Sequence, residues 1–475
     1  MSKVLTNEYN YLNIANAIRN KQKSSTQFLP SEMAAAIDGL PTGLVVTNGV
    51  TAQYKAISTD IPEKTFVEFT PGSMAEGISY GEGSVSQLAS GYTAPSGVDL
   101  TDEKSVVLYV DASAALYASV VTYNNGAAVY GTPVAITPSG AQMYTFASGK
   151  AIKKLSDTEV VICYVAKGVD AQMGNTYCAY CVVATINGTN ISLGSPVMAK
   201  SDATDVYMDV TSSGYIIVVD AATSSGTAIK LSVSGTTLSV VSTVSVPTPG
   251  TLNNYGGMGV VAFGNDNIFV FIGNSSSTLY GVIGDASSST ITFGSPSSLG
   301  TGSSYGVQLW DIKLIGEDLV VYTCGFYSSD PVRPRVGAVK VSSTSVGTVY
   351  IPAATGTSDS GYSAICEIDS THVAVVVNMT GRSYPYRVTI PLAAAISVTS
   401  YGYSTGAKNV GYIKRFSEGS ALAFGNSGSS SGYLQTLPLN GPTLVRPSQT
   451  KIDGITGSTV TSATAGDIWV LNQGS

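Results

Sequence analysis

Hydrophobic and polar positions follow one pattern that recurs seven times after residue 95. In each copy an apolar strand ends in a bulky residue, a polar turn of four or five residues follows, and a second strand rich in β-branched residues begins. Short apolar runs bounded by turn residues predict β-hairpins. The first strands end at Leu100, Leu155, Val210, Phe263, Ile315, Ile368 and Phe416. The second strands begin at Val106, Val160, Ile216, Ile268, Leu319, Val373 and Ala421.

The spacing of these hairpins predicts the fold. Successive second strands begin 48 to 56 residues apart, which leaves enough chain for two hairpins in each unit. The other hairpin of a unit is visible at 176–199, where Asn187-Gly188 separates two strands, and Asn-Gly is a strong hairpin signal. A β-rich repeat of this length is typical of four-stranded propeller blades. We therefore predict an all-β fold, with a seven-bladed β-propeller over residues 96–475.

Two other arrangements of the same repeat are an open β-solenoid and a pair of smaller propellers. The near-constant period, with no linker in the middle, disfavours the pair. A ring leaves no exposed end strands when its first and last blades join. We expect the C-terminal segment 465–473, with Trp469 in an apolar strand, to complete the first blade.

Near the N-terminus the apolar period changes from that of a strand to that of a helix. Apolar residues at helical spacing include Leu12, Ile14 and Ile18 in a first segment, and Met33 and Ile37 in a second. A proline before the second segment and a glycine after it suit the two ends of a helix. Helices this short need a partner surface to be stable. Residues 1–42 are therefore predicted to form a helical hairpin that docks onto another structure.

The segment between the hairpin and the repeat, residues 43–95, holds short strands and a Gly/Ser-rich stretch. We predict a small β connector here. A flexible linker is the alternative interpretation.

Composition agrees with an all-β protein and excludes several functions. Only 12% of residues are charged, against about 25% in an average domain. The formal net charge is -7, so no basic surface is available for phosphates, and nucleic acid is excluded as a partner. The apolar runs are too short to cross a bilayer, which excludes membrane insertion. The N-terminus lacks the apolar segment of a secretory signal, so assembly in a cytoplasm is expected.

Histidine and cysteine form no recognisable catalytic or metal site. The single histidine, His372, is expected in an exposed turn, and neither a GxSxG motif nor the SxDxGxTW box of propeller sialidases is present. The five cysteines are scattered through apolar strands, which predicts buried thiols. Cys178 and Cys181 are expected on opposite faces of one strand, where they cannot bind one metal ion. These observations predict no catalytic residue, no metal and no cofactor, and hence no enzyme.

All arginines except Arg19 lie in the last third of the chain, and several of them lie beside tyrosines in the sequence. Guanidinium groups bind carboxylates in a bidentate manner, and tyrosine rings can pack on sugar faces, so this cluster predicts glycan binding. The candidate ligand-binding residues are Tyr327, Arg333, Arg335, Arg382, Tyr384 and Tyr386. The simpler alternative, which we favour, is that they are solubilising residues on a charge-poor surface.

The N-terminal hairpin also carries a family resemblance. Ala17-Ile18-Arg19, Lys21, the Pro-x-Glu-Met at 30–33 and Ile37 resemble a helical hairpin that recurs in tail, baseplate and neck appendage proteins of bacteriophages. The resemblance covers about 30 residues, and Gln22-Lys23 stand where the usual hairpin has a glycine. The repeats likewise look like propellers of phage tail-fibre proteins.

The resemblance implies a virion structural protein, assembled in the host cytoplasm as a homo-oligomer, whose N-terminus docks onto other virion proteins. The docking residues would be Leu12, Ile14, Ile18, Arg19, Met33 and Ile37. The propeller would then bind a glycan on the host surface. One alternative is a propeller-type glycoside hydrolase with two carboxylates in its central mouth. Another is an architectural collar or decoration protein without a receptor.

Overall fold

The computed structural model describes residues 51–54, 66–71, 83–85 and, with gaps at several loops, 95–470. The predicted helical hairpin and its docking side chains lie outside these residues. Every regular element that is described is a strand, and no helix among the described residues could span a membrane. The chain divides into two compact units, one of residues 1–79 with 440–475 and one of residues 80–439.

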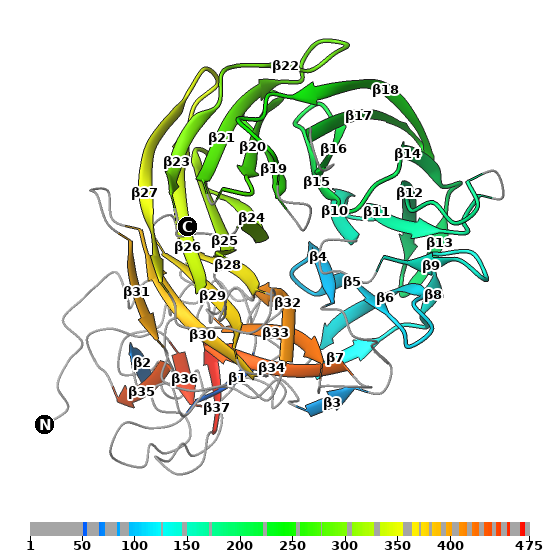
Figure 1. Ribbon diagram of the computed structural model, residues 1–475. Coiled ribbons are helices and arrows are strands. Elements are labelled where there is room, and N and C mark those ends of the chain that lie inside the picture. Colours follow the sequence, from blue (N-terminus) through cyan, green and yellow to red (C-terminus); the bar gives the residue numbers. More distant parts are fainter. Residues whose placement is uncertain are drawn as a thin grey trace, which may run out of the picture. The chain divides into compact units, whose positions relative to one another are not determined.

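Five consecutive antiparallel sheets in the larger unit are the blades of a propeller-like arrangement (Figure 1). Their first strands are β4 (Ser96–Thr101), β10 (Lys150–Ser156), β15 (Tyr207–Val210), β19 (Met258–Phe263) and β24 (Val307–Ile315). Their second strands are β5 (Lys104–Val110), β11 (Glu159–Lys167), β16 (Ile216–Ala221), β20 (Asn267–Gly273) and β25 (Leu319–Phe326). Their third strands are β6 (Leu116–Asn124), β12 (Cys178–Asn187), β17 (Gly226–Ser234), β21 (Thr278–Asp285) and β26 (Arg333–Val341). Their fourth strands are β7 (Ala127–Tyr130), β13 (Asn190–Leu193), β18 (Thr237–Val246), β22 (Thr292–Phe293) and β27 (Val346–Ala354).

Four shorter strands pair beside these sheets. They are β8 (Val134–Ala135), β9 (Gln142–Met143), β14 (Val197–Ser201) and β23 (Ser297–Thr301).

Two further four-stranded sheets follow along the same unit. One consists of β28 (Ser363–Asp369), β29 (His372–Met379), β30 (Arg382–Thr389) and β31 (Ser397–Ser400). The other consists of β32 (Lys408–Arg415), β33 (Ser420–Asn426), β34 (Gly432–Pro438) and the early strand β3 (Gly83–Val85). Each first strand from β4 to β28 contacts the first strand of the next sheet, and β32 contacts β4.

The sequence-based prediction of an all-β, propeller-like fold is confirmed. A hairpin is found at each of the seven predicted positions. Its second strand begins within one residue of the predicted start, except in β5, which begins two residues before Val106. The second strands are the most deeply buried, as in β16, where all six residues are buried. Both faces of these strands are covered by neighbouring sheets, which explains their continuous runs of β-branched residues.

The prediction that the C-terminal segment completes the first blade is wrong. Trp469 lies in β37 (Gly466–Val470), which pairs with β1 (Thr51–Tyr54) and β36 (Gly454–Thr456) in the smaller unit. This five-stranded sheet also contains β2 (Phe66–Pro71) and β35 (Thr443–Pro447). The first blade already has four consecutive strands, so it has no place for another. The sheet that lacks a fourth strand from its own segment is that of β32–β34, and β3 supplies it.

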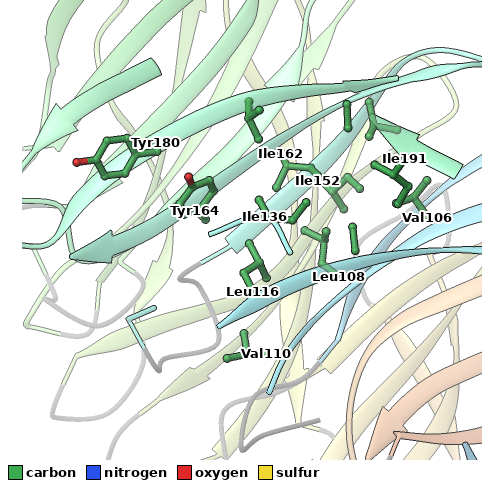
Figure 2. Close-up of a cluster of buried hydrophobic side chains, with 14 of the residues drawn as sticks. Val106, Leu108, Val110, Leu116, Ile136, Ile152, Ile162, Tyr164, Tyr180 and Ile191 are labelled. Carbon is green, nitrogen blue, oxygen red and sulfur yellow. The ribbon is translucent and has the colours of Figure 1, made fainter. Parts of the chain in front are cut away.

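The core lies between neighbouring sheets. Leu108 and Leu116 of the first sheet pack with Ile152 and Ile162 of the second in one buried cluster (Figure 2). Each side chain of this kind contributes about 1.5–3 kcal/mol when fully buried. Cys178 belongs to this cluster, whereas Cys181 belongs to the cluster between the second and third sheets.

The predictions for the cysteines are therefore confirmed. Cys178 and Cys181 lie on opposite faces of β12, and all five cysteines are buried and free.

Side-chain to backbone hydrogen bonds connect the first strands of successive sheets. The Asp209 carboxylate accepts a hydrogen bond from the backbone N–H of Ala262 at 2.9 Å. The Asp311 carboxylate accepts one from Ile365 at 2.7 Å. Between the last sheet and the first, the Lys414 amine donates to the Thr101 carbonyl at 3.1 Å. Hydrogen bonds to charged groups are stronger than neutral ones, so these contacts hold the sheets in register around the centre.

Candidate functional site

A cavity of about 380 Å³ lies where the first strands of the sheets meet. Most of its lining comes from the first strands β4, β10, β15, β19, β24, β28 and β32. This volume is in the range of small-molecule sites, which combine apolar walls with a few polar groups. The ionisable side chains and the tryptophan among its lining residues are Asp99, Lys150, Lys153, Tyr207, Trp310, Asp311, Lys313 and Tyr412.

Lys150, the first residue of β10, is the most unusual of these side chains. It is only 4% exposed, and its Nζ has no hydrogen-bond partner in the described structure. Burial lowers the pKa of Lys150 from 10.5 to about 7. Neutral and protonated amine are therefore both populated near neutral pH, so the amine can either accept a proton or hold an anion.

The two other lysines that are buried in the described part of the chain both have partners. Lys230 donates to the carbonyls of Ala286 at 2.6 Å and Ser288 at 2.7 Å, and its amine lies over the Tyr215 ring. Lys414 donates to a carbonyl and lies 3.6 Å from the Asp99 carboxylate. Buried charges normally have such partners, so Lys150 differs from both.

Asp311 lies beside a β-bulge in β24. The register of β24 against β25 shifts between Leu309 and Asp311, and Trp310 is the extra residue. The Asp311 carboxylate accepts hydrogen bonds from the backbone N–H groups of Ile312 at 2.8 Å and Ile365 at 2.7 Å. Burial raises the pKa of Asp311, against the opposing effect of Lys313, these hydrogen bonds and Lys153. Bulges often re-aim side chains next to functional sites.

Trp310 also lines the cavity and has an unpaired buried donor. The residue is 8% exposed, and its indole Nε1 has no hydrogen-bond partner in the described part of the chain. A buried indole N–H normally finds an acceptor. The residue belongs to the buried apolar cluster that contains Ile365 and Val375 of the next sheet.

Tyr207 reaches past one strand to a more distant one. Its hydroxyl donates to the Leu309 carbonyl of β24 at 2.8 Å. Tyr207 is on β15, and β19 contacts both β15 and β24, so the side chain reaches across β19. Gly259 of β19 allows close packing here, because an added Cβ would lie 2.1 Å from Leu309 Cδ2. Burial raises the pKa of Tyr207, and the negative charges of Asp205 and Asp311 raise it further.

Several other ionisable groups of the wall are paired. Lys153 forms an ion pair with Asp209 at 3.0 Å. The Tyr412 hydroxyl donates to the Asp99 carboxylate and lies 2.8 Å from the Ser105 hydroxyl. In contrast, burial lowers the pKa of Lys150 and raises the pKa of Asp311. Shifts toward neutral pH are a common property of catalytic acids and bases.

The sequence-predicted ligand residues lie elsewhere. Arg333 and Arg335 are on β26, and Arg382, Tyr384 and Tyr386 are on β30, the third strands of two neighbouring sheets. None of them lines the cavity. Tyr327 lies outside the described residues. Tyr386 is only 8% exposed and belongs to a buried apolar cluster, so its ring is not free to receive a sugar.

His372 is the first residue of β29 and is half-buried, whereas an exposed turn position was expected. It does not line the cavity. Among the described residues no cluster of histidine, cysteine, aspartate and glutamate could hold a metal ion.

The sequence alone did not point to Lys150, Tyr207, Trp310 or Asp311 as residues of one cavity. Their signal is a charged or aromatic residue inside the apolar first strand of a repeat, as in "KAIKKL" and "LWDIKLI". Aligned repeats place such residues on neighbouring inner strands, but only the assembled sheets show that they share one cavity.

Known proteins were compared with the chain at the levels of family, sequence and structure. No family model matches it, and no curated protein matches it. Solved structures do match. An ulvan lyase, described as a polysaccharide lyase of a new family PL25, is 10% identical with a TM-score of 0.49, over 78% of this chain and 97% of the lyase.

Two other solved structures are similar over most of this chain. A Trypanosoma rangeli sialidase is 11% identical with a TM-score of 0.37, over 80% of this chain and 60% of the sialidase. A Lactobacillus plantarum protein is 12% identical with a TM-score of 0.44, over 72% of this chain and all of that protein (100%).

This comparison corrects the sequence-based conclusion that the protein is not an enzyme. The similar structures include a polysaccharide lyase and a sialidase. With identities of 10–12% and TM-scores below 0.5, these similarities assign no reaction or residue to this chain.

Proposed function

We propose that the protein is a glycan-cleaving propeller whose site is the central cavity. The observation that carries this proposal is the pair of ionisable groups in one cavity wall, Lys150 and Asp311, whose pKa values burial moves in opposite directions toward neutrality. Sites of this kind combine apolar walls with a few convergent polar groups.

We also propose that all seven sheets close into one seven-bladed ring. The contact of β32 with β4 joins the last sheet to the first. The hydrogen bonds of Lys414 to Thr101 and of Tyr412 to Asp99 cross the same junction. Closure supports the proposed function because it makes the cavity a pocket enclosed by first strands on every side.

Cleavage of a glycosidic bond by either elimination or hydrolysis needs one group to accept a proton and another to donate one. The neutral amine of Lys150 is suited to accept a proton. The carboxyl of Asp311, with its raised pKa, is suited to donate one. Lys153 and Lys313 surround Asp311 with positive charge, which limits how far its pKa rises.

The proposal is tested by incubating the full chain with a panel of acidic and neutral polysaccharides. New reducing ends report any cleavage, and absorbance of an unsaturated sugar product reports elimination alone. Asp311→Asn is expected to reduce the rate by about 10² to 10⁴-fold, the usual contribution of acid–base catalysis. Arg335→Gln, on β26 away from the cavity, serves as the control and should retain activity. Equal rates for wild type and Asp311→Asn would contradict the assignment of the site.

A second proposal concerns where the protein acts. The similarity of residues 14–41 to a phage docking hairpin favours an appendage of a phage particle. In this proposal other virion proteins hold the chain as a homo-oligomer, and the propeller is presented to host-surface glycans. Labelling virions at this chain tests the location directly. A label on the tail, baseplate or neck is expected, and particles without label would contradict it.

A further inference from the structure

We infer that Tyr207 is a positioning residue, whose hydroxyl holds the bulge of β24 and thereby fixes the Asp311 carboxylate in the cavity wall. The effect on catalysis rests on the proposed function, in which Asp311 donates a proton. The hydrogen bonds and the packing around the bulge support this role.

The bulge places one extra residue in β24. Leu309 lies opposite Cys324 of β25 and Asp311 lies opposite Thr323, so Trp310 has no residue of its own across the pair. A bulge disrupts the ladder of hydrogen bonds locally and bends its strand. The positions of these three residues of β24 therefore depend on contacts from outside the β24–β25 pair.

The Tyr207 hydroxyl supplies one of these contacts. It donates to the carbonyl of Leu309 at 2.8 Å, on the residue directly before the extra one. Tyr207 belongs to the third sheet and Leu309 to the fifth. This hydrogen bond therefore fastens the start of the bulge to a sheet that is not its neighbour.

Gly259 of β19 leaves the space that this contact needs. A Cβ at Gly259 would lie 2.1 Å from Leu309 Cδ2 and 3.3 Å from Ile312 Cγ2. Gly259 is not among the glycines with a positive φ, so close packing is the reason for a glycine here, not backbone conformation. A larger residue would push Leu309 away from Tyr207.

The residues after Leu309 are held from the opposite direction. Trp310 packs in the buried apolar cluster that contains Ile365 of β28. The Asp311 carboxylate accepts a hydrogen bond from the backbone N–H of Ile365 at 2.7 Å. Leu309 itself packs in the cluster between the fourth and fifth sheets. The bulge is thus held between Tyr207 and β28, and release at one end should loosen the other.

The phenol of Tyr207 is suited to be a permanent donor. Burial raises the pKa of Tyr207 well above its ordinary value, and the negative charges of Asp205 and Asp311 raise it further. The hydroxyl therefore keeps its proton throughout the neutral range. It remains a donor to Leu309 and does not serve as a base.

The test compares the full wild-type chain with Tyr207→Phe, which keeps the ring and removes only the hydroxyl. Hydrogen exchange of the Ile365 amide, followed by NMR of protein with labelled isoleucine, reports the Asp311–Ile365 hydrogen bond without any substrate. We expect this amide to exchange at least about fivefold faster in Tyr207→Phe, as the loss of one hydrogen bond predicts. The Ile217 amide of β16 is the internal reference and should change less.

The control variant is Tyr280→Phe, which removes a hydroxyl on β21 outside the cavity and should leave exchange at Ile365 unchanged. In the polysaccharide assay, Tyr207→Phe should lower kcat by about tenfold and change KM by less than about twofold, because the hydroxyl acts on the acid and not on substrate binding.

The outcomes separate this inference from the proposed function. Unchanged exchange at Ile365 in Tyr207→Phe, or equal acceleration at Ile365 and Ile217, would overturn the positioning role even if the protein cleaves a glycan. Selective acceleration at Ile365 in a protein that cleaves no polysaccharide would support the positioning role and contradict the proposed function alone.

A structure of the wild type decides the case in which Tyr207→Phe does not fold. A bulge at Trp310, with the Tyr207 oxygen within hydrogen-bond distance of the Leu309 carbonyl, would support the inference. A regular β24, or a Tyr207 hydroxyl directed away from Leu309, would overturn it.

Discussion

At the scale of the residue, the buried amine of Lys150 should have a measurable effect on the stability of the folded protein. Burial lowers the pKa of Lys150 in the folded state to about 7, against 10.5 in an unfolded chain. Between these values the unfolded chain binds more protons than the folded one, so stability rises with pH from about 7 to about 10. Below about pH 7 both states are protonated, and the cost of burying the charge is fully present.

We therefore predict that Lys150→Met stabilises the protein, most strongly near pH 7 and below. The gain should be on the order of a few kcal/mol there, and it should shrink as pH rises toward about 10. Urea unfolding of wild type and variant across this range measures the difference. The other ionisable groups of the cavity, Asp99, Lys153, Tyr207, Asp311, Lys313 and Tyr412, are common to both proteins. A difference in stability that does not change with pH would contradict the assigned pKa.

At the scale of the element, the strands were predictable and the positions of functional side chains on them were not. Local patterns in the chain encode each hairpin, because strand and turn signals are contained in about 15 residues. The pairing of β3 with β34, about 350 residues apart, has no such local signal. The bulge that places Trp310 and Asp311 at the cavity is equally invisible in the sequence.

A Gly-x-Pro motif follows the fourth strand in three blades, at Gly131, Gly194 and Gly294. Its glycine has a packing role that the sequence does not reveal. A Cβ on Gly194 would lie 2.5 Å from the Thr236 carbonyl oxygen in the next sheet. A Cβ on Gly131 would lie 2.6 Å from the Thr189 carbonyl oxygen. The glycine therefore allows the fourth strand of one blade to approach the backbone turn of the next.

This repeat offers a matched pair of variants. Gly194→Ala should destabilise the protein by about 1–3 kcal/mol, because backbone atoms must move to admit the methyl group. Gly294→Ala, at the equivalent position of a later blade, meets only the Ile283 carbonyl oxygen at 3.7 Å and should be nearly neutral. Thermal unfolding of the two variants measures the contrast. Equal losses at both positions would show that close packing is not the reason for the glycine.

At the scale of the whole molecule, the cavity exists only because many sheets meet. Lys150, Tyr207 and Asp311 come from three sheets and are spread over more than 150 residues of sequence. The sequence predicted the repeat, the all-β class and the buried thiols. It placed ligand binding on the arginine and tyrosine cluster of β26 and β30 because charge and aromatic composition are visible without the fold. Burial and missing hydrogen-bond partners, which distinguish Lys150 and Trp310 from the other residues that line the cavity, are properties of the assembled structure alone.

The most direct test of the central claim is an experimental structure of the full chain with an oligosaccharide bound. We predict a sugar in the cavity that the first strands line, beside Lys150 and Asp311. A sugar bound instead at Arg333, Arg335 or Arg382, with the cavity free of sugar, would contradict the account.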